Sequence, residues 1–100
     1  MRIVVKKVGQ PPEVKEVNCE LYELKEIVGG WIESFRLGFN NILCVCNEEG
    51  KLFKLPVNFI CHGDPICGDV FFCSKGYDDF ESLNDEQIET IMTLMQVFEK

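Results

Sequence analysis

The chain has 100 residues, of which 46% are hydrophobic and 27% are charged, and its formal net charge is −7. This length and composition are typical of one globular domain, expected over residues 1–100, and exclude a disordered chain. No apolar run approaches the ~20 residues of a membrane-spanning helix, so we expect no membrane association. The opening MRIVVKKVG has a short apolar run and no cleavage site. We therefore expect no signal peptide and a cytoplasmic location.

Two strands are predicted at the start of the chain. Arg2 to Val8 is rich in β-branched residues, which indicates a strand covered on both faces near the centre of a sheet. A turn is predicted at residues 9–12, where a glycine precedes two prolines. Glu13 to Val17 then alternates polar and apolar residues, which predicts a half-exposed strand.

A short helix is predicted from about Cys19 to Val28. Asn18 is a suitable N-cap, because its side-chain oxygen can accept a hydrogen bond from the first turn. Gly29 and Gly30 supply the permissive backbone that ends a helix. Apolar residues recur on one helical face. They are Leu21, Leu24, Ile27 and Val28.

The middle of the chain predicts a β-hairpin. Trp31 to Leu37 alternates in a strand pattern, with one mostly apolar face. Glu33 is the discordant member of that face, which favours a position near a sheet edge. Residues 38–41 form a turn whose two asparagines tolerate left-handed backbone. Ile42 to Cys46 is apolar on both faces and predicts a buried partner strand.

The next segments are less regular. Lys51 to Leu55 is consistent with a short strand or with one helical turn, and Pro56 ends either one. Asn58 to Asp64 is predicted as a loop with a partly buried centre. Ile66 to Cys73 is predicted as the last strand, with a bulge or kink where Gly68 precedes an aspartate.

The chain ends in an acidic loop and a helix. Ser74 to Ser82 is predicted as the loop, and Asn84 as the N-cap of the helix. Gln87 stands three residues later, as in a capping box, and Leu83 and Ile88 fit a hydrophobic staple. An apolar stripe is predicted to dock on the sheet. Its members are Ile88, Ile91, Met92, Met95 and Phe98.

These elements predict an α+β fold in one small domain. We expect a four- or five-stranded mixed or mainly antiparallel sheet with two helices packed on it, in the order β-β-α-β-β-β-α. An apolar edge strand of such a sheet could pair with a second copy of the chain, so a homodimer stays open.

Negative charge is concentrated in one region. Residues 64–89 contain eight acidic residues and one basic residue, and the rest of the chain is balanced. An acidic region repels the phosphate backbone, which argues against direct nucleic-acid binding. A solvated surface is the simplest interpretation. The functional alternative is a docking face for an as yet unidentified basic protein, for which the candidate residues are Asp78, Asp79 and Glu81.

Six cysteines and one histidine offer further chemistry. The cysteines are Cys19, Cys44, Cys46, Cys61, Cys67 and Cys73. Most lie among apolar residues, where cysteine packs as a small hydrophobe, and no C-x2-C knuckle typical of zinc occurs. We therefore expect reduced structural thiols, no metal and no cofactor. A less favoured alternative is an enzyme or metalloprotein that uses Cys61, His62 and Asp64, which requires these side chains to converge.

A small-molecule site is a further alternative. Gly29 and Gly30 lack the length and the lysine of a phosphate-binding loop, so helix capping is the simpler interpretation. A buried pocket lined by Trp31 with convergent polar groups would favour a ligand site at Gly29, Gly30 and Trp31.

Short motifs spread over almost the whole chain carry a family resemblance. They are the MRIVVKK start, IVGGWIE, CNEEGKL followed by Leu55-Pro56 and Asn58, an I-x-G-D-V strand at Ile66 to Val70, and DFESLNDEQIE. By these motifs the chain resembles the domain-of-unknown-function 3846 family, small proteins typical of phages, plasmids and conjugative elements of Firmicutes and related gut bacteria. Cys67 and Cys73 stand where the resemblance implies small or β-branched residues, which favours a packing role for these two cysteines.

The resemblance implies a genomic setting and carries over no catalytic residue. We therefore expect a non-enzymatic accessory protein of a phage or mobile element that binds a macromolecular partner, in counter-defence or in regulation.

Overall fold

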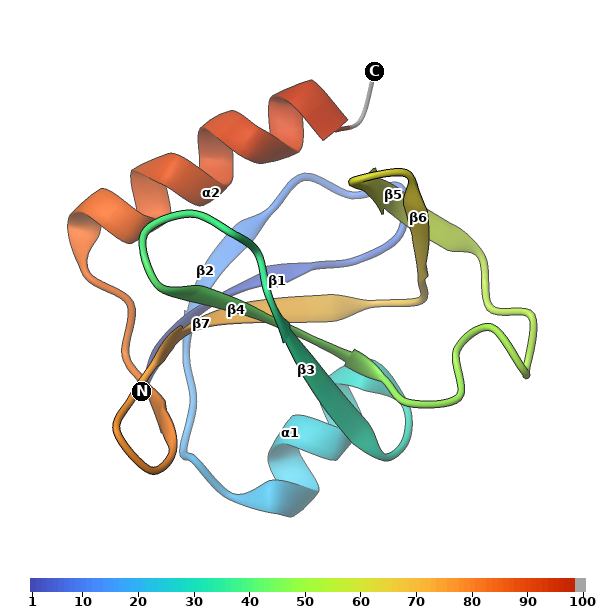
Figure 1. The fold of residues 1–100 in the computed structure, drawn as a ribbon. Helices are drawn as coiled ribbons and strands as arrows, with labels where there is room; N and C mark the ends of the chain where they lie inside the picture. Colours follow the sequence, from blue (N-terminus) through green and yellow to red (C-terminus); the bar gives the residue numbers. More distant parts are fainter. Residues whose placement is uncertain (99–100) are drawn as a thin grey trace.

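An antiparallel sheet lies between two helices in the computed structural model, which describes residues 1–98 (Figure 1). In chain order, its elements are β1 (Arg2–Lys6), β2 (Glu13–Glu16), α1 (Leu21–Val28), β3 (Ile32–Arg36), β4 (Ile42–Asn47), β5 (Val57–Cys61), β6 (Asp64–Cys67), β7 (Val70–Lys75), β8 (Phe80–Glu81) and α2 (Asp85–Phe98). The α+β prediction is confirmed, and the chain forms more strands than expected.

The main sheet has six strands, and every pairing in it is antiparallel. Its order is β2-β1-β7-β4-β3, and β8 pairs with β7 beside this path. β5 and β6 form a separate two-stranded hairpin. The strands β1, β4 and β7 are almost wholly buried, which confirms the prediction of two-faced strands at Arg2 to Val8 and at Ile42 to Cys46.

Each face of the sheet has its own apolar core. On the α1 side the core contains Ile3, Val5, Leu24, Val28, Leu43, Val45, Phe71 and Cys73. On the α2 side it contains Val4, Leu37, Ile42, Cys44, Cys46, Phe59, Cys61, Ile66, Val70, Phe72, Leu83, Ile91 and Met95. The β5–β6 hairpin shares the second face with α2, where the rings of Phe59 and Phe98 stack at 5.8 Å. Both predicted helices therefore dock as expected.

The predicted start of the first helix is wrong. Helix α1 begins at Leu21, and its N-cap is Glu20, which makes no side-chain capping bond. The reason is that Val17 still pairs with the chain start: its N–H donates to the Met1 carbonyl at 2.9 Å. Asn18 therefore lies too early to cap the helix. The end is as predicted, since Gly29 adopts φ 79° and its N–H donates to Lys25 at 2.8 Å.

The predicted loop at Asn58 to Asp64 is also wrong, because these residues build the β5–β6 hairpin. His62 and Gly63 form its two-residue turn, and both have positive φ, at 50° and 81°. This is the geometry of a type I′ turn, whose twist suits a hairpin. The usual Asn-Gly signal is absent, and a histidine takes the first left-handed position.

Ile66 to Cys73 is not one strand. The chain breaks at Gly68, with φ 85°, so β6 joins the small hairpin and β7 enters the main sheet. The break is held by long-range bonds: Asn58 donates from Nδ2 to the carbonyls of Lys6, at 2.7 Å, and Gly68, at 2.9 Å. The predicted kink is therefore real, but it separates two strands of different sheets.

Two further segments differ from or narrow the predictions. The predicted loop at Ser74 to Ser82 is shorter, because β7 extends to Lys75 and β8 pairs back against it. Residues 51–54 form a turn, with the Phe53 N–H donating to the Glu49 carbonyl at 2.9 Å. Of the two alternatives for Lys51 to Leu55, the helical turn is the one observed.

The capping box of α2 is confirmed. The Gln87 N–H donates to Asn84 Oδ1 at 2.8 Å, and the Asn84 N–H donates to Gln87 Oε1 at 2.9 Å. The buried Gln87 also donates from Nε2 to the Asn40 carbonyl and to Ser74 Oγ, both at 2.9 Å. One side chain thus ties the helix start to the β3–β4 turn and to β7.

We predict that Gln87→Ala lowers the free energy of unfolding by about 2–4 kcal/mol, because it removes the cap and leaves buried partners without hydrogen bonds. Denaturant unfolding measures this loss. Gln96→Ala, at an exposed position of the same helix, is the matched control and should change stability by no more than about 0.5 kcal/mol. Equal losses in the two variants would contradict the role assigned to Gln87.

Candidate functional site

The predicted docking residues belong to one structured hairpin. We call residues 76–81, which are the β7–β8 turn and β8, the acidic hairpin. Asp78, Asp79 and Glu81 are all exposed in it, and Tyr77 is 96% exposed. The Gly76 N–H donates to the Asp79 carbonyl at 2.9 Å, and Asp79 Oδ1 accepts from the Phe80 N–H at 2.7 Å. The carboxylates are therefore presented on a closed turn.

A hollow of about 450 Å³ separates the acidic hairpin from β3 on the α1 side of the sheet. We call it the α1-side hollow. One wall carries Asp78 and Asp79, the other carries Arg36 from β3, and Lys75 at the end of β7 also lines the hollow. Leu43 and Phe80 also line it, so apolar surface lies between charged walls. No sequence pattern predicts this hollow, because Arg36 on one wall and Asp78 on the other are more than 35 residues apart along the chain.

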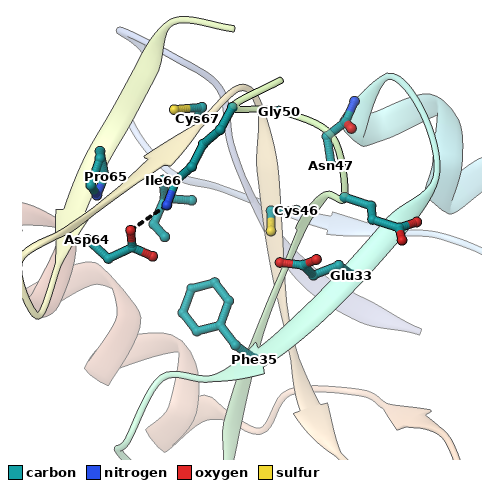
Figure 2. Close-up of a pocket in the computed structure, with 11 residues that line it drawn as sticks. Glu33, Phe35, Cys46, Asn47, Gly50, Asp64, Pro65, Ile66 and Cys67 are labelled. Atoms are coloured by element: carbon teal, nitrogen blue, oxygen red, sulfur yellow. Dashed lines mark hydrogen bonds and ion pairs between the residues drawn. The ribbon is translucent and has the colours of Figure 1, made fainter. Parts of the chain in front are cut away.

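A smaller cleft of about 120 Å³ lies beside β3 on the α2 side, between that strand and β6. We call it the α2-side cleft. Figure 2 shows the side chains of Glu33, Phe35, Cys46 and Asp64 pointing into it. At its mouth the Lys51 ammonium forms an ion pair with the Asp64 carboxylate, and both side chains are more than half exposed. The discordant Glu33 was the only sequence signal for this site.

Burial keeps the core cysteines protonated. It raises the pKa of the Cys46 thiol to about 11, with the Glu33 and Asp64 carboxylates adding to the effect. It also raises the pKa of Cys73 to about 12 and that of Cys44 well above its usual range. A thiol that stays protonated is a poor nucleophile and a poor metal ligand. These three cysteines therefore act as packing residues at neutral pH.

Cys61, His62 and Asp64 flank one turn but face different surroundings. Cys61 is buried in the α2-side core, and burial raises its pKa. The exposed His62 places Nε2 3.4 Å from the Leu37 carbonyl oxygen, and Asp64 pairs with Lys51. Within residues 1–98, no three His, Cys, Asp or Glu side chains are arranged to hold a metal ion. The arrangement brings together no nucleophile, base and orienting group of the kind that covalent catalysis uses.

The alternative ligand residues lie where α1 ends. A side chain at Gly30 would meet Asn47 Nδ2 at 2.9 Å, which explains the second glycine as a close-packing requirement. Trp31 is 56% exposed, and the Lys25 ammonium lies 3.5 Å from its ring centroid, a cation–π contact. A ligand pocket at Gly29, Gly30 and Trp31 stays a prediction.

Comparison with known proteins supports the family resemblance. A family model described as Domain of unknown function (DUF3846) matches residues 1–96. No curated protein and no solved structure matched the chain. Across the described residues, neither helix is long and apolar enough to cross a membrane.

The raised thiol pKa values predict a loss of stability at alkaline pH. The folded protein holds the protons of Cys46 and Cys73 more tightly than the unfolded chain, in which the thiol pKa is near 9. Their contribution is therefore complete below about pH 9 and is lost as the pH rises toward 11 and 12. Denaturant unfolding at a series of pH values should show a falling free energy of unfolding over this window.

The double variant Cys46→Val/Cys73→Val is expected to make that decline shallower, whereas the exposed-site variant Cys19→Ser is expected to retain it. A decline of the same slope in the double variant would show that other groups cause it.

Proposed function

The chain belongs to the domain-of-unknown-function 3846 family, and on that premise we propose that it is a small accessory protein of a phage or other mobile element that acts by binding a basic protein partner. A counter-defence or regulatory role follows from such a setting. The observation that carries the proposal is the acidic hairpin, which presents three carboxylates around an almost fully exposed tyrosine.

The carboxylates of the acidic hairpin are available to a partner. No ion pair within the described residues uses Asp78, Asp79 or Glu81. Surface carboxylates of this kind increase the rate of association with a basic partner and repel phosphate backbones. Tyr77 adds apolar area with a polar tip, the type of side chain that often dominates binding energy at protein interfaces. The local chemistry therefore favours a protein over a nucleic acid.

The hairpin is also held in position before any partner arrives. Lys75 pairs with Phe80 and Ser74 with Glu81, and the Phe80 ring meets Phe71 of the core edge-to-face at 6.4 Å. A Cβ added at Gly76 would lie 2.3 Å from the Asp79 carbonyl oxygen, so only glycine allows this turn to close. A preorganised surface loses less conformational entropy on binding, which favours a recognition role.

We predict that the triple variant Asp78→Asn/Asp79→Asn/Glu81→Gln captures its partner about tenfold less well than the unchanged protein. The reason is the loss of charge attraction, so the difference should shrink at high salt, where exposed charges are screened. The measurement is affinity purification of the tagged full chain from lysate of the bacterium that carries the gene. Bound proteins are quantified at low and at high salt.

The control triple variant Glu13→Gln/Glu26→Gln/Glu89→Gln removes the same number of exposed charges elsewhere on the surface. This control variant should capture the partner as well as the unchanged protein does. The proposal fails if no protein is captured, or if both triple variants weaken capture equally.

A further inference from the structure

Strand β3 leaves one edge of the main sheet open. It is the last strand of the sheet, and among residues 1–98 its hydrogen-bonded neighbour is β4 alone (Figure 1). The Leu37 N–H donates to the Ile42 carbonyl at 2.9 Å, and the Glu48 N–H to the Trp31 carbonyl at 2.8 Å. Hydrogen-bonded pairs alternate along an antiparallel ladder, so Glu33 and Phe35 also bond inward.

The intervening residues of β3 therefore direct their backbone groups outward. Ile32, Ser34 and Arg36 turn both the N–H and the C=O away from β4. Such a row of unpaired groups is a template for another strand. The edge is also accessible, since Glu33, Ser34 and Arg36 are exposed and β3 has no proline within it.

The opposite edge of the sheet is protected. Strand β2 reads Glu-Val-Lys-Glu, is exposed at every position and follows two prolines. Charged side chains and prolines are common devices against edge-to-edge pairing. The two edges therefore differ in kind, and β3 is the one suited to accept a strand.

Hollows lie on both faces of β3, and such hollows can select the side chains of an added strand. The α1-side hollow is lined by Ser34 and Arg36, and the α2-side cleft by Glu33 and Phe35. Alternate side chains of an added strand point to opposite faces of the sheet. One set would enter the hollow and the other the cleft. The backbone template and the two side-chain sites thus coincide on a single strand.

We propose that β3 is a strand-addition site that takes an extended, basic segment of the partner protein. This inference rests on the proposed function and supplies its binding mode. The added backbone bonds to Ile32, Ser34 and Arg36. Its basic side chains meet Asp78 and Asp79 of the acidic hairpin on the α1 side. The intervening apolar side chains enter the α2-side cleft beside Phe35.

Charge argues against a second copy as the occupant. Two identical edge strands pair antiparallel about an axis perpendicular to the sheet, which places equivalent faces side by side. Both acidic hairpins would then lie on the same face of one continuous sheet. Each chain also has a formal net charge of −7, so self-pairing is opposed by repulsion that a basic segment would relieve.

The test uses two capped nine-residue peptides of alternating valine and lysine or valine and glutamate, titrated into the full chain by calorimetry. The Val/Lys peptide should bind, and the Val/Glu peptide at least tenfold more weakly. Amide hydrogen exchange by NMR should show new protection at Ile32, Ser34 and Arg36 when the Val/Lys peptide is bound. Acidic docking without strand addition would not protect these amides.

Variant Ser34→Pro removes one outward N–H and leaves the inward hydrogen bonds of Glu33 and Phe35 intact. Position 34 is one where an edge strand tolerates proline, because its N–H faces solvent. The variant should weaken binding of the Val/Lys peptide at least tenfold. Val14→Pro is the matched control on β2, where Val14 also directs its N–H outward, because Val17 pairs inward with Met1. It should bind the peptide as the unchanged protein does, and circular dichroism checks that both variants fold.

Three outcomes overturn the inference. They are Val/Lys binding without protection at the β3 amides, no Val/Lys binding at all, and a concentration-dependent dimer in sedimentation that Ser34→Pro abolishes. The first two leave the proposed function standing if the acidic-hairpin triple variant still loses partner capture. The third identifies a second copy as the occupant of β3. The capture experiment alone tests the proposed function itself.

Discussion

The fold depends on the burial of β7 at the centre of the sheet. This strand hydrogen-bonds to β1, β4 and β8, and five of its six residues are buried. Its residues alternate between the two cores: Phe71 and Cys73 belong to the α1 side, and Val70 and Phe72 to the α2 side. Apolar side chains on both faces of one strand require a cover on both faces. One helix alone could cover only one face of β7. The placement of α1 and α2 on opposite faces of the sheet follows from the burial of both faces.

The central position of β7 also determines what lies at the edges. Because β7 separates β1 from β4, their partner strands β2 and β3 form the two opposite edges of the sheet. The turn after β7 borders the same hollow as β3, where Asp78 and Asp79 lie with Ser34 and Arg36. The acidic residues and the open edge strand are thus brought together by a strand that contributes little to either surface. Placement of the candidate site is a consequence of sheet order and not of any local motif.

Sequence patterns predicted the parts of the structure that local interactions decide. The two-faced strands, the left-handed Gly29 and the Asn84–Gln87 capping box each depend on residues close together in the chain, and each is confirmed. The errors occur where distant residues decide. Asn18 is displaced from its capping role by the pairing of Val17 with Met1, and the β5–β6 hairpin forms around a histidine in a position where asparagine is usual. The acidic residues were visible in the sequence, and Glu33 correctly indicated an edge position for its strand. The proximity of the two was not predictable, because strand order is non-local.

The same negative charge can serve two purposes at the β3 edge. A solvent-exposed edge strand can pair with strands of other chains, and natural proteins reduce that risk with charged side chains. On β2 the charge lies in the strand itself, whereas on β3 much of it lies beside the strand, in the acidic hairpin and around the α2-side cleft. Charge placed beside an edge repels a second copy and leaves the backbone groups accessible. In the proposed binding mode, the same carboxylates oppose pairing with an identical chain and favour a basic segment, so one set of charges contributes to specificity in two ways.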